Sequence, residues 1–392
     1  MGTSLMRRVA VVGVGQSAFT RSCGVSIREL CFEAFKEAMD GLNLSPKEIE
    51  GSIVCSAPEY DKQRTPSGLV AEYLGLTPKP TFLVETICAS STTGVGVAYS
   101  MIRAGLKDVV AVIGFQKMSE LTSAEAQERM GRGGDIMWES PFGIMMPAQY
   151  AMYARAHMKR YGTTEEQLAK VREKNSKYGA LNPKAMFRKP VTVEEVLKSR
   201  VIASPLKLLD CCANADGASC VILASEEKAR KITDTPVWIA GWGSASDTMT
   251  LANRTLFTGL TCAIEASREA YRMAGVEPKD IDVAEVHDCF TIAEIMAYEN
   301  LGFCKPGEGG KLIEEGQTYV GGRIPVNVDG GLLSKGHPIG ATGGSQVRTI
   351  VHQLRGDAYK IHPDIQVRGA EVGLVHNVGG VGLYANVLIF TR

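Results

Sequence analysis

Two stretches of this chain repeat one another, and the duplication limits the folds that are open to it. Ala-rich amphipathic helical patterns begin at Leu30 and Cys262, and a Pro-Lys-acidic-Ile turn and a short apolar strand follow each one. Pro46 pairs with Pro278, and the same offset places Glu33, Ala34, Glu37 and Ala38 on Glu265, Ala266, Glu269 and Ala270. The sequence therefore predicts two copies of one α/β unit.

Each copy contains further matching segments. A Gly-punctuated strand opens each copy, "VAVVGVG" from Val9 and "VWIAGWG" from Val237. Later in each copy a Gly-, Ser- and Thr-rich loop precedes a helix, in "ICASSTTGVGVAYSMIRAG" and in "GHPIGATGGSQVRTIVHQLRG". Apolar strands from Val109 and Tyr384 are expected to follow these helices. Two β-α-β-α-β halves that pack about a pseudo-twofold axis would bring their corresponding loops to one pocket.

The repeat also sets the expected domain boundaries. Residues 1–118 together with 206–232 form the first half, and residues 233–392 form the second. Residues 119–205 lack the repeat and are expected to be an inserted loop domain that covers the crevice. Within it the Met-rich "GIMMPAQYAMYARAHM" is expected to serve ordinary helix packing.

Composition excludes several classes of protein. Lys and Arg number 43 against 43 Asp and Glu, so no overall charge favours nucleic acid or an anionic membrane. No apolar run has the length of a membrane span, and "MGTSLMRRVAVVGVG" contains no signal-peptide pattern. The ten cysteines are scattered without the spacing of a metal site, and Cys211-Cys212 is the only close pair. We therefore expect a cytoplasmic protein without a bound metal.

Three positions could carry chemistry, each with a plainer alternative. Cys88 lies where a strand gives way to a helix, whose N-terminus lowers a thiol pKa, although many cysteines are simply buried. His337 lies in a Gly-rich loop that could equally cradle a phosphate. His376 opens "HNVGGVG", which also fits a glycine turn between two strands. A fourth stretch, "VHDCF" with His287 and Cys289, stands at another strand-to-helix junction, where open α/β sheets place their sites.

Taken together and in this order, these motifs resemble the thiolase superfamily, in particular its sterol-carrier-protein-2-type branch with its archaeal relatives. The nucleophile loop at Cys88, "HDCF" at His287, "GHPIGATG" at Gly336 and "NVGGVG" near the end carry the resemblance across the whole chain. It implies a five-layered αβαβα thiolase fold. It also implies a homodimer or dimer of dimers with coenzyme A beneath the inserted domain.

The resemblance also implies roles for individual residues. Cys88 would accept the acyl group, and His337 would activate it and line an oxyanion hole. His287 stands where many thiolases have Asn and would support that hole. A backbone amide somewhere from Val378 to Gly380 would join the Cys88 amide in a second hole. Most thiolases have a second catalytic cysteine near the C-terminus, where this chain has His376, so Cys289 is expected to be the acid/base and His376 the alternative candidate.

The activity implied is an acetyl-CoA C-acetyltransferase that condenses two acetyl-CoA molecules to acetoacetyl-CoA and needs no further cofactor. The alternatives are a degradative 3-ketoacyl-CoA thiolase of broader chain length, a decarboxylating ketosynthase and a non-catalytic acyl-CoA-binding scaffold. Archaeal relatives suggest a mevalonate route and a complex with hydroxymethylglutaryl-CoA synthase and a small zinc-ribbon/OB-fold protein. The basic turn with Lys184, Arg188 and Lys189 is a candidate for binding the phosphates of coenzyme A.

Overall fold

The computed structural model describes residues 7–392, so the first six residues of the N-terminal stretch lie outside the described part. Nine strands form one mixed sheet in the order β3-β2-β4-β7-β1-β8-β11-β10-β9. Strands β1 and β8 are paired at only two positions, Ala10 with Trp238 and Val11 with Val237. The nine strands therefore divide into two sheets, one from each half, which are joined only where β1 pairs with β8. Within residues 7–392, no helix is long and apolar enough to cross a membrane.

The first half supplies five strands and the helices that cover them. Its strands are β1 (Val9–Gln16), β2 (Gly51–Cys55), β3 (Thr81–Val84), β4 (Val109–Lys117) and β7 (Asp216–Ser225). Its helices are α1 (Ile27–Met39), α2 (Pro66–Tyr73), α3 (Ser90–Arg103) and α8 (Glu226–Ile232).

The second half supplies the other four strands. These are β8 (Val237–Ser246), β9 (Val283–Glu285), β10 (Val372–Gly379) and β11 (Tyr384–Thr391). Its helices are α9 (Thr261–Ala274), α10 (Thr291–Asn300), α11 (Gly309–Glu314), α12 (Gly331–Lys335) and α13 (Thr342–Arg355).

The topology of the two halves confirms the duplication. In each half two parallel strands, β2 with β4 and β9 with β10, are followed by antiparallel partners. Short 3₁₀ turns at Pro46–Glu48 and Pro278–Asp280 precede β2 and β9, as the repeated Pro-Lys motif predicted. One pairing of the sequence analysis was wrong. The counterpart of β4 is β10, because each of them has a parallel strand on one side and an antiparallel strand on the other. The strand from Tyr384 is β11, which is the counterpart of β7 and has antiparallel neighbours only.

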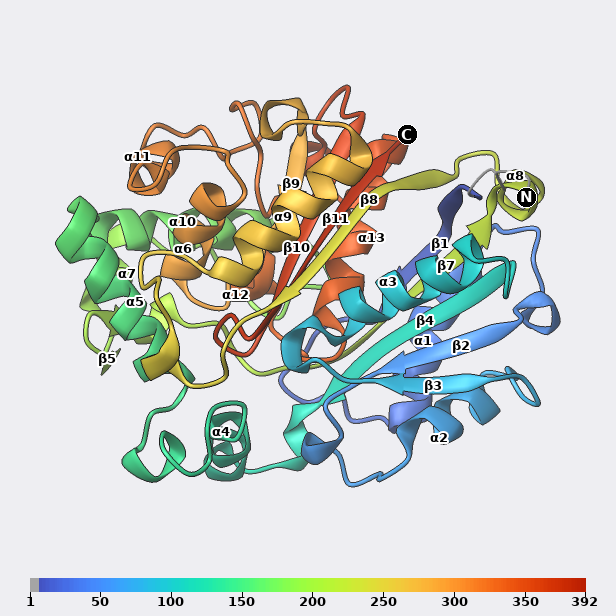
Figure 1. Ribbon diagram of the computed structural model, residues 1–392, viewed down its shortest axis with the longest axis horizontal. Coiled ribbons are helices and arrows are strands. Elements are labelled where there is room, and N and C mark those ends of the chain that lie inside the picture. The colour runs from blue at the N-terminus through green and yellow to red at the C-terminus, as the bar shows by residue number, and fades with distance from the viewer. Residues whose placement is uncertain (1–6) are drawn as a thin grey trace.

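The five predicted layers follow from which helices contact which strands. Helix α1 packs on β1, β4 and β7, and α9 packs on β8 and β11 on the other side of the molecule (Figure 1). Between the two sheets α3 and α13 pack against each other, and α13 contacts strands of both halves. The sequence of β1 is apolar up to Gln16 because both faces of the strand are buried. Val9 and Val11 enter the middle core, whereas Ala10 and Val12 enter the outer one, so both faces are buried.

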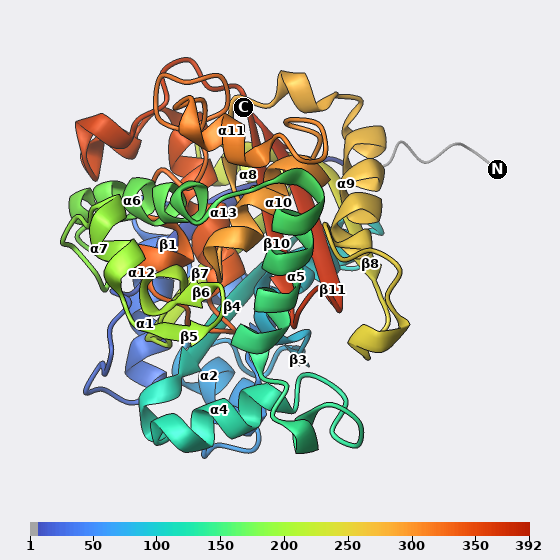
Figure 2. The same ribbon diagram turned by 90° about the vertical axis from the view of Figure 1, so that its left-hand side faces the viewer.

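The segment between β4 and β7 faces the viewer in Figure 2. It contains α4 (Ser123–Gly131), α5 (Met146–Tyr161), α6 (Glu165–Leu181), α7 (Val193–Lys198), β5 (Val201–Ala203) and β6 (Leu206–Lys207). Helix α6 packs on α10, α11 and α12 of the second half. The segment is therefore fixed to the half that supplies three of the four candidate catalytic residues.

A fully buried ion pair helps to hold this contact. The Lys174 ammonium on α6 contacts the Glu294 carboxylate on α10, and neither side chain is exposed to solvent. The other carboxylate oxygen of Glu294 accepts hydrogen bonds from the Asn175 and Asn327 amides, each at 2.7 Å. Asn327 in turn accepts the Val286 backbone N–H at 2.8 Å. The network thus connects α6 to the end of β9, one residue before His287.

We expect Lys174→Met to lower the free energy of unfolding by about 3–5 kcal/mol, because it leaves the Glu294 carboxylate buried without its cation. Denaturant unfolding followed by circular dichroism would measure the change. The control is Lys198→Met, which breaks an exposed pair with Glu194 and should change stability by less than about 0.5 kcal/mol. A change at Lys174 no larger than that of the control would contradict the prediction.

Candidate active site

Cys88 lies in a strained turn between β3 and α3. It is the middle residue of a 3₁₀ turn, Ile87–Ala89, that runs directly into α3. Ile87 has a φ of 55°, which is rare for a β-branched residue and marks strain of the kind found at functional sites. Gly379, at the end of β10, lies so close that a Cβ there would overlap the Thr86 carbonyl oxygen. The nucleophile turn and the end of β10 are therefore packed backbone to backbone.

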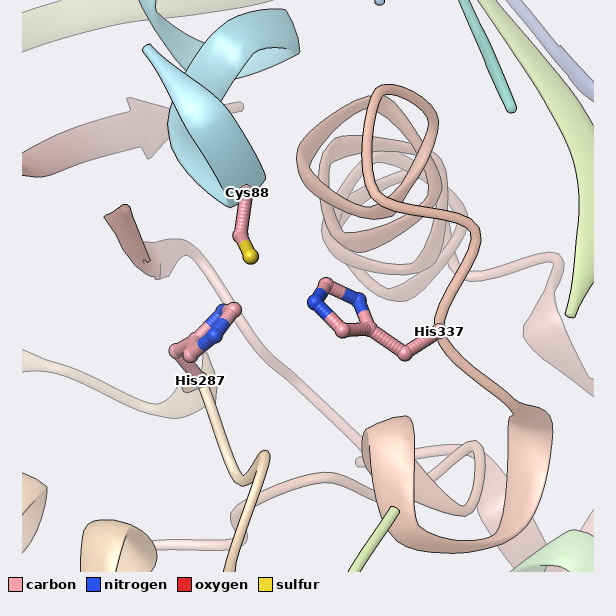
Figure 3. A group of neighbouring side chains, drawn as sticks. All are labelled: Cys88, His287 and His337. Carbon is pink, nitrogen blue, oxygen red and sulfur yellow. The ribbon is translucent and has the colours of Figure 1, made fainter. Parts of the chain in front are cut away.

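His287 and His337 approach Cys88 from two other loops. His287 follows β9, and His337 lies in the loop between α12 and α13. The Cys88 sulfur and one ring nitrogen of each histidine all lie within 4.8 Å of one another. Figure 3 shows the three side chains pointing toward one another. The histidine rings are 5.2 Å apart between centroids and are nearly perpendicular, at 80°. Thiol and imidazole groups are also donors that zinc prefers, so the expected absence of a metal stays a prediction.

These side chains open into one cavity of about 230 Å³. Cys289 and Gly380 also contribute to its wall. Within the described part of the chain, no Lys, Arg, Asp or Glu lines it. The remaining lining residues are mostly apolar: Tyr60, Ile87, Gln127, Met130, Met146, Pro147, Tyr150, Ile202, Leu208, Cys211, Cys212, Asn214, Phe290 and Ile339. The Met-rich segment was expected only to pack, but Met146, Pro147 and Tyr150 of α5 form part of the wall.

The Cys88 thiol is protonated in the resting site. Burial raises its pKa to about 12, and the nearby Glu85 carboxylate adds to the rise. The Gly380 backbone N–H beside the sulfur lowers the pKa only in part. Position at a helix start therefore does not by itself produce a thiolate. The thiol needs a neighbouring base to remove its proton.

The neighbouring His337 ring is neutral and its hydrogen bonds favour one tautomer. Burial lowers its pKa to about 3, so the ring is neutral. Its Nδ1 lies 2.6 Å from the Thr342 hydroxyl, which also lies 3.1 Å from the Pro338 carbonyl oxygen. A hydroxyl that donates to the carbonyl four residues earlier can accept the Nδ1–H. The buried Nε2, which has no partner among the described residues, then carries a lone pair.

His287 is also neutral, because burial and the neighbouring His337 and His376 rings hold its pKa well below the usual range. Its Nδ1 lies 2.9 Å from the side-chain amide of Asn377. Asn377 was not recognised from the sequence, although it directly follows His376. No pattern in the sequence indicates that this amide reaches the residues that follow β9.

Cys289 lies beside the same cavity and is almost fully buried. Burial raises its pKa well above the usual range, whereas the neighbouring Tyr150 hydroxyl acts in the opposite direction. Tyr150 stacks on Phe290 with 4.7 Å between ring centroids. Tyr150 is therefore a second residue that the sequence did not identify.

Asp288 is the residue between His287 and Cys289, and it holds their turn against α12. Its carboxylate accepts the backbone N–H groups of Leu332 at 2.7 Å and Leu333 at 3.1 Å, at the start of α12. The Asn175 amide donates to it at 2.7 Å. Since α12 leads directly to His337, this carboxylate sets the distance between the two histidine loops. Asp288 is part of the "HDCF" motif, but its role could not be predicted because its partners lie far away in the sequence.

The "HNVGGVG" stretch was expected to be a turn, but most of it belongs to β10. His376 lies inside β10 rather than in a turn, and it does not line the cavity. Burial lowers its pKa to about 4, and both ring nitrogens lack a partner among residues 7–392. Val378 belongs to the apolar core. Within the stretch from Val378 to Gly380, it is the Gly380 backbone N–H that lies beside the Cys88 sulfur, together with the N–H of Cys88 itself.

The three basic residues proposed for phosphate binding lie outside the cavity wall. The Lys184 ammonium is already paired with the Glu37 carboxylate, which also binds Arg348 at 2.7 Å. Lys184 therefore has a protein partner for its charge, which makes it a weaker candidate for phosphate binding than the other two residues. Arg188 and Lys189 are exposed.

The resting state of Cys88 gives a test by alkylation. Because the thiol pKa is about 12, the thiolate fraction should rise about tenfold per pH unit across the range 6.5 to 9.5. The rate of iodoacetamide labelling of the Cys88 peptide, followed by mass spectrometry, should rise with it and show no plateau. A plateau below pH 8 would mean that the site holds a preformed thiolate instead.

A duplicated, layered α/β core with a cysteine at the start of one central helix and histidines on the facing loops defines the thiolase class of proteins. Family comparison agrees over nearly the whole chain. The description "Thiolase, N-terminal domain" matches residues 9–227, and "Thiolase C-terminal domain-like" matches residues 243–392. The chain belongs to the thiolase family and is an acyltransferase.

Individual relatives share this architecture. The chain is 42% identical to the acetyl-CoA acetyltransferase of Methanothermobacter thermautotrophicus, over 99% of this chain and 100% of the relative. It is 35% identical to sterol carrier protein 2 of Bos taurus, over 96% of this chain and 70% of that protein. Among solved structures, the "Ltp2-ChsH2(DUF35) aldolase" superposes with a TM-score of 0.86 at 29% identity, and the match covers 99% of each chain.

Proposed function

We propose that this protein is an acetyl-CoA C-acetyltransferase, which condenses two acetyl-CoA molecules to acetoacetyl-CoA and free coenzyme A. The observation that carries the proposal is the convergence of Cys88, His287 and His337 on one uncharged cavity beside Cys289. The full-length similarity to an archaeal enzyme of that name supports it. Broader 3-ketoacyl-CoA cleavage is the same chemistry in reverse, and the apolar cavity is compatible with longer acyl groups.

In the first half-reaction the Cys88 thiol gives its proton to His337 Nε2, and the sulfur attacks the thioester carbon of acetyl-CoA. The new carbon–sulfur bond forms as the bond to coenzyme A breaks, and Cys289 supplies the proton to the departing thiolate. The Gly380 N–H beside the sulfur is positioned to stabilise the oxyanion of the tetrahedral intermediate.

In the second half-reaction the Cys289 thiolate removes a proton from the methyl carbon of a second acetyl-CoA. The burial that raises the Cys289 pKa also makes its thiolate a stronger base. His287 and His337 hold the enolate oxygen, and the enolate carbon attacks the acetyl group on Cys88. A carbon–carbon bond forms, the bond to the Cys88 sulfur breaks, and acetoacetyl-CoA is released. His337 then returns its proton to the Cys88 thiolate, which restores the resting site. His376 remains the lower-ranked candidate for the base, since it does not line the cavity.

The charge of the cavity argues against the decarboxylating ketosynthase. A malonyl group would bring a carboxylate into this cavity. Among the described residues, no Lys or Arg lines the cavity, and the neutral forms of His287 and His337 are favoured. Burial of an unpaired carboxylate is costly. An acetyl group has no such cost.

Acyl transfer is tested by intact-protein mass spectrometry after a brief mix with acetyl-CoA, together with an assay for acetoacetyl-CoA. Wild type should gain one acetyl group, and Cys88→Ala should gain none. Cys289→Ala should gain the acetyl group but form acetoacetyl-CoA at least about 10²-fold more slowly. Cys212→Ala, at another cysteine of the cavity wall, is the control and should retain most activity.

Each other result has a distinct meaning. Full activity of Cys289→Ala would move the base to His376. An adduct without condensation would indicate a longer acyl substrate or a missing partner. Condensation that requires malonyl-CoA would establish the ketosynthase, and the absence of any adduct from acetyl-CoA or longer acyl-CoAs would favour the scaffold.

We further propose a homodimer that forms through β3. This strand lies at the outer edge of the first sheet, and Phe82 and Leu83 on it are 49% and 37% exposed. An apolar edge strand is an open surface for pairing with another strand. A dimer of dimers would use further surfaces.

Size-exclusion chromatography with light scattering tests the dimer. Wild type should elute with the mass of two chains or a multiple of it, and Leu83→Lys should shift it toward one chain. Leu106→Lys changes another exposed leucine, in the loop between α3 and β4, and should leave the mass unchanged. A wild-type monomer would exclude the dimer.

The remaining assignments also belong to the proposal. The ten cysteines are unpaired, which fits a reducing cytoplasm. Acetoacetyl-CoA is the substance that a mevalonate route would require. The neighbouring structure names two proteins, Ltp2 and ChsH2(DUF35), which supports a partner protein here as well. We propose a zinc-ribbon/OB-fold protein and hydroxymethylglutaryl-CoA synthase in that role, and Arg188 and Lys189 as candidates for the coenzyme A phosphates.

A further inference from the structure

We propose that Asn377, held by Thr92, is a positioning residue that places the proton of the neutral His287 ring on Nε2, so that this nitrogen donates to the substrate oxygen. The inference rests on the proposed function for its catalytic meaning. Its structural content, which nitrogen carries the proton, is independent of any activity.

Three buried side chains form the chain of contacts. The Thr92 hydroxyl on α3 lies 3.0 Å from Asn377 Oδ1, and Asn377 Nδ2 on β10 lies 2.9 Å from His287 Nδ1. Thr92 and Asn377 are not exposed at all, and His287 is 2% exposed. Water therefore has little access to these groups, and the side chains must satisfy one another.

An amide can lie in two orientations in such a chain, and each one fixes a different tautomer of His287. If the amide nitrogen faces the ring, it donates to Nδ1, so Nδ1 carries a lone pair and the proton is on Nε2. If the amide oxygen faces the ring, the proton is on Nδ1 and Nε2 can only accept. The choice decides whether His287 can stabilise an enolate oxygen.

Thr92 favours the first orientation. Its single hydroxyl hydrogen has two acceptors within reach, Asn377 Oδ1 and the Ala89 carbonyl oxygen at 2.9 Å. Ala89 is the N-cap residue of α3, and the carbonyl of an N-cap residue already accepts the first hydrogen bond of the helix. Asn377 Oδ1 has no such alternative donor, so the hydroxyl hydrogen is directed to it. The amide nitrogen then faces His287.

The neighbouring His337 favours the same choice. Its contact with Thr342 leaves a lone pair on Nε2, as described above. A ring nitrogen of each histidine lies within 4.8 Å of the other and of the Cys88 sulfur. A lone pair on both would place two negative ends together, whereas an N–H on His287 is complementary to the lone pair on His337. In the resting site His337 is then the proton acceptor and His287 is the hydrogen-bond donor.

The nitrogen that carries the proton is read directly by long-range proton–nitrogen NMR of the intact protein with ¹⁵N-labelled histidine. The chain contains 6 histidines, so His287 can be assigned by comparison with His287→Gln. In wild type we expect the proton on Nε2. In Asn377→Asp the carboxylate can only accept, so Nδ1 should gain a proton.

Asn386 provides a matched control. It is the register partner of Asn377 on β11 and is equally buried, but its amide donates to Thr93 at 2.8 Å rather than to a histidine. Asn386→Asp should leave the His287 signals unchanged. Thr92→Val removes the hydroxyl at constant shape and should give a mixture of the two tautomers, which keeps the test available if Asn377→Asp does not fold.

Kinetics separate this inference from the proposed function. Asn377→Leu should keep acetyl transfer to Cys88 within about threefold but slow carbon–carbon bond formation by about 10 to 100-fold. A wild-type proton on Nδ1, or an unchanged Nδ1 in Asn377→Asp, would overturn the inference even if the enzyme is a thiolase. The expected tautomers without any acetyl transfer would overturn the proposed function and leave the assignment of the proton intact.

Discussion

The site depends on the contact between α3 and α13 in the middle layer of the molecule. Each helix begins at the end of a loop that carries a reactive residue, Cys88 before α3 and His337 before α13. Because the two helices are packed against each other between two sheets, neither loop can move without disturbing apolar cores on both sides. A duplicated fold thus places corresponding loops of its halves at one point, and the chemistry uses that convergence.

Buried polar contacts fix the positions of the loops that carry His287 and His337. Asp288 binds the first N–H groups of α12 and so couples the His287 turn to the His337 loop. The ion pair of Lys174 with Glu294 and the amide of Asn327 fix the end of β9 against α6. All of these groups are buried, so each is strengthened by its surroundings and each would be costly to leave unpaired. The precision of the site comes from this network rather than from the loops themselves.

Burial also determines the protonation states on which the proposed mechanism relies. It raises the pKa of Cys88 and Cys289 and lowers the pKa of His287 and His337, so the resting site is neutral. Proton transfer from a thiol to an imidazole would create a thiolate and an imidazolium, and burial disfavours both charges in the empty cavity. Charge then develops mainly when substrate is bound, where N–H donors face the oxygen that receives it.

The sequence alone determined the duplication, the layered α/β fold and the motifs that contain Cys88, His287, Cys289 and His337, because repeats and motifs are local patterns along the chain. It placed His376 in a turn and offered Lys184 as a phosphate ligand, because a local pattern does not show strand register or the partner of a cation. Only the tertiary structure brought Tyr150 to Cys289, Asp288 to α12 and Asn377 to His287. These contacts join residues from distant parts of the chain, and they depend on how two sheets and their helices pack rather than on any spacing in the sequence.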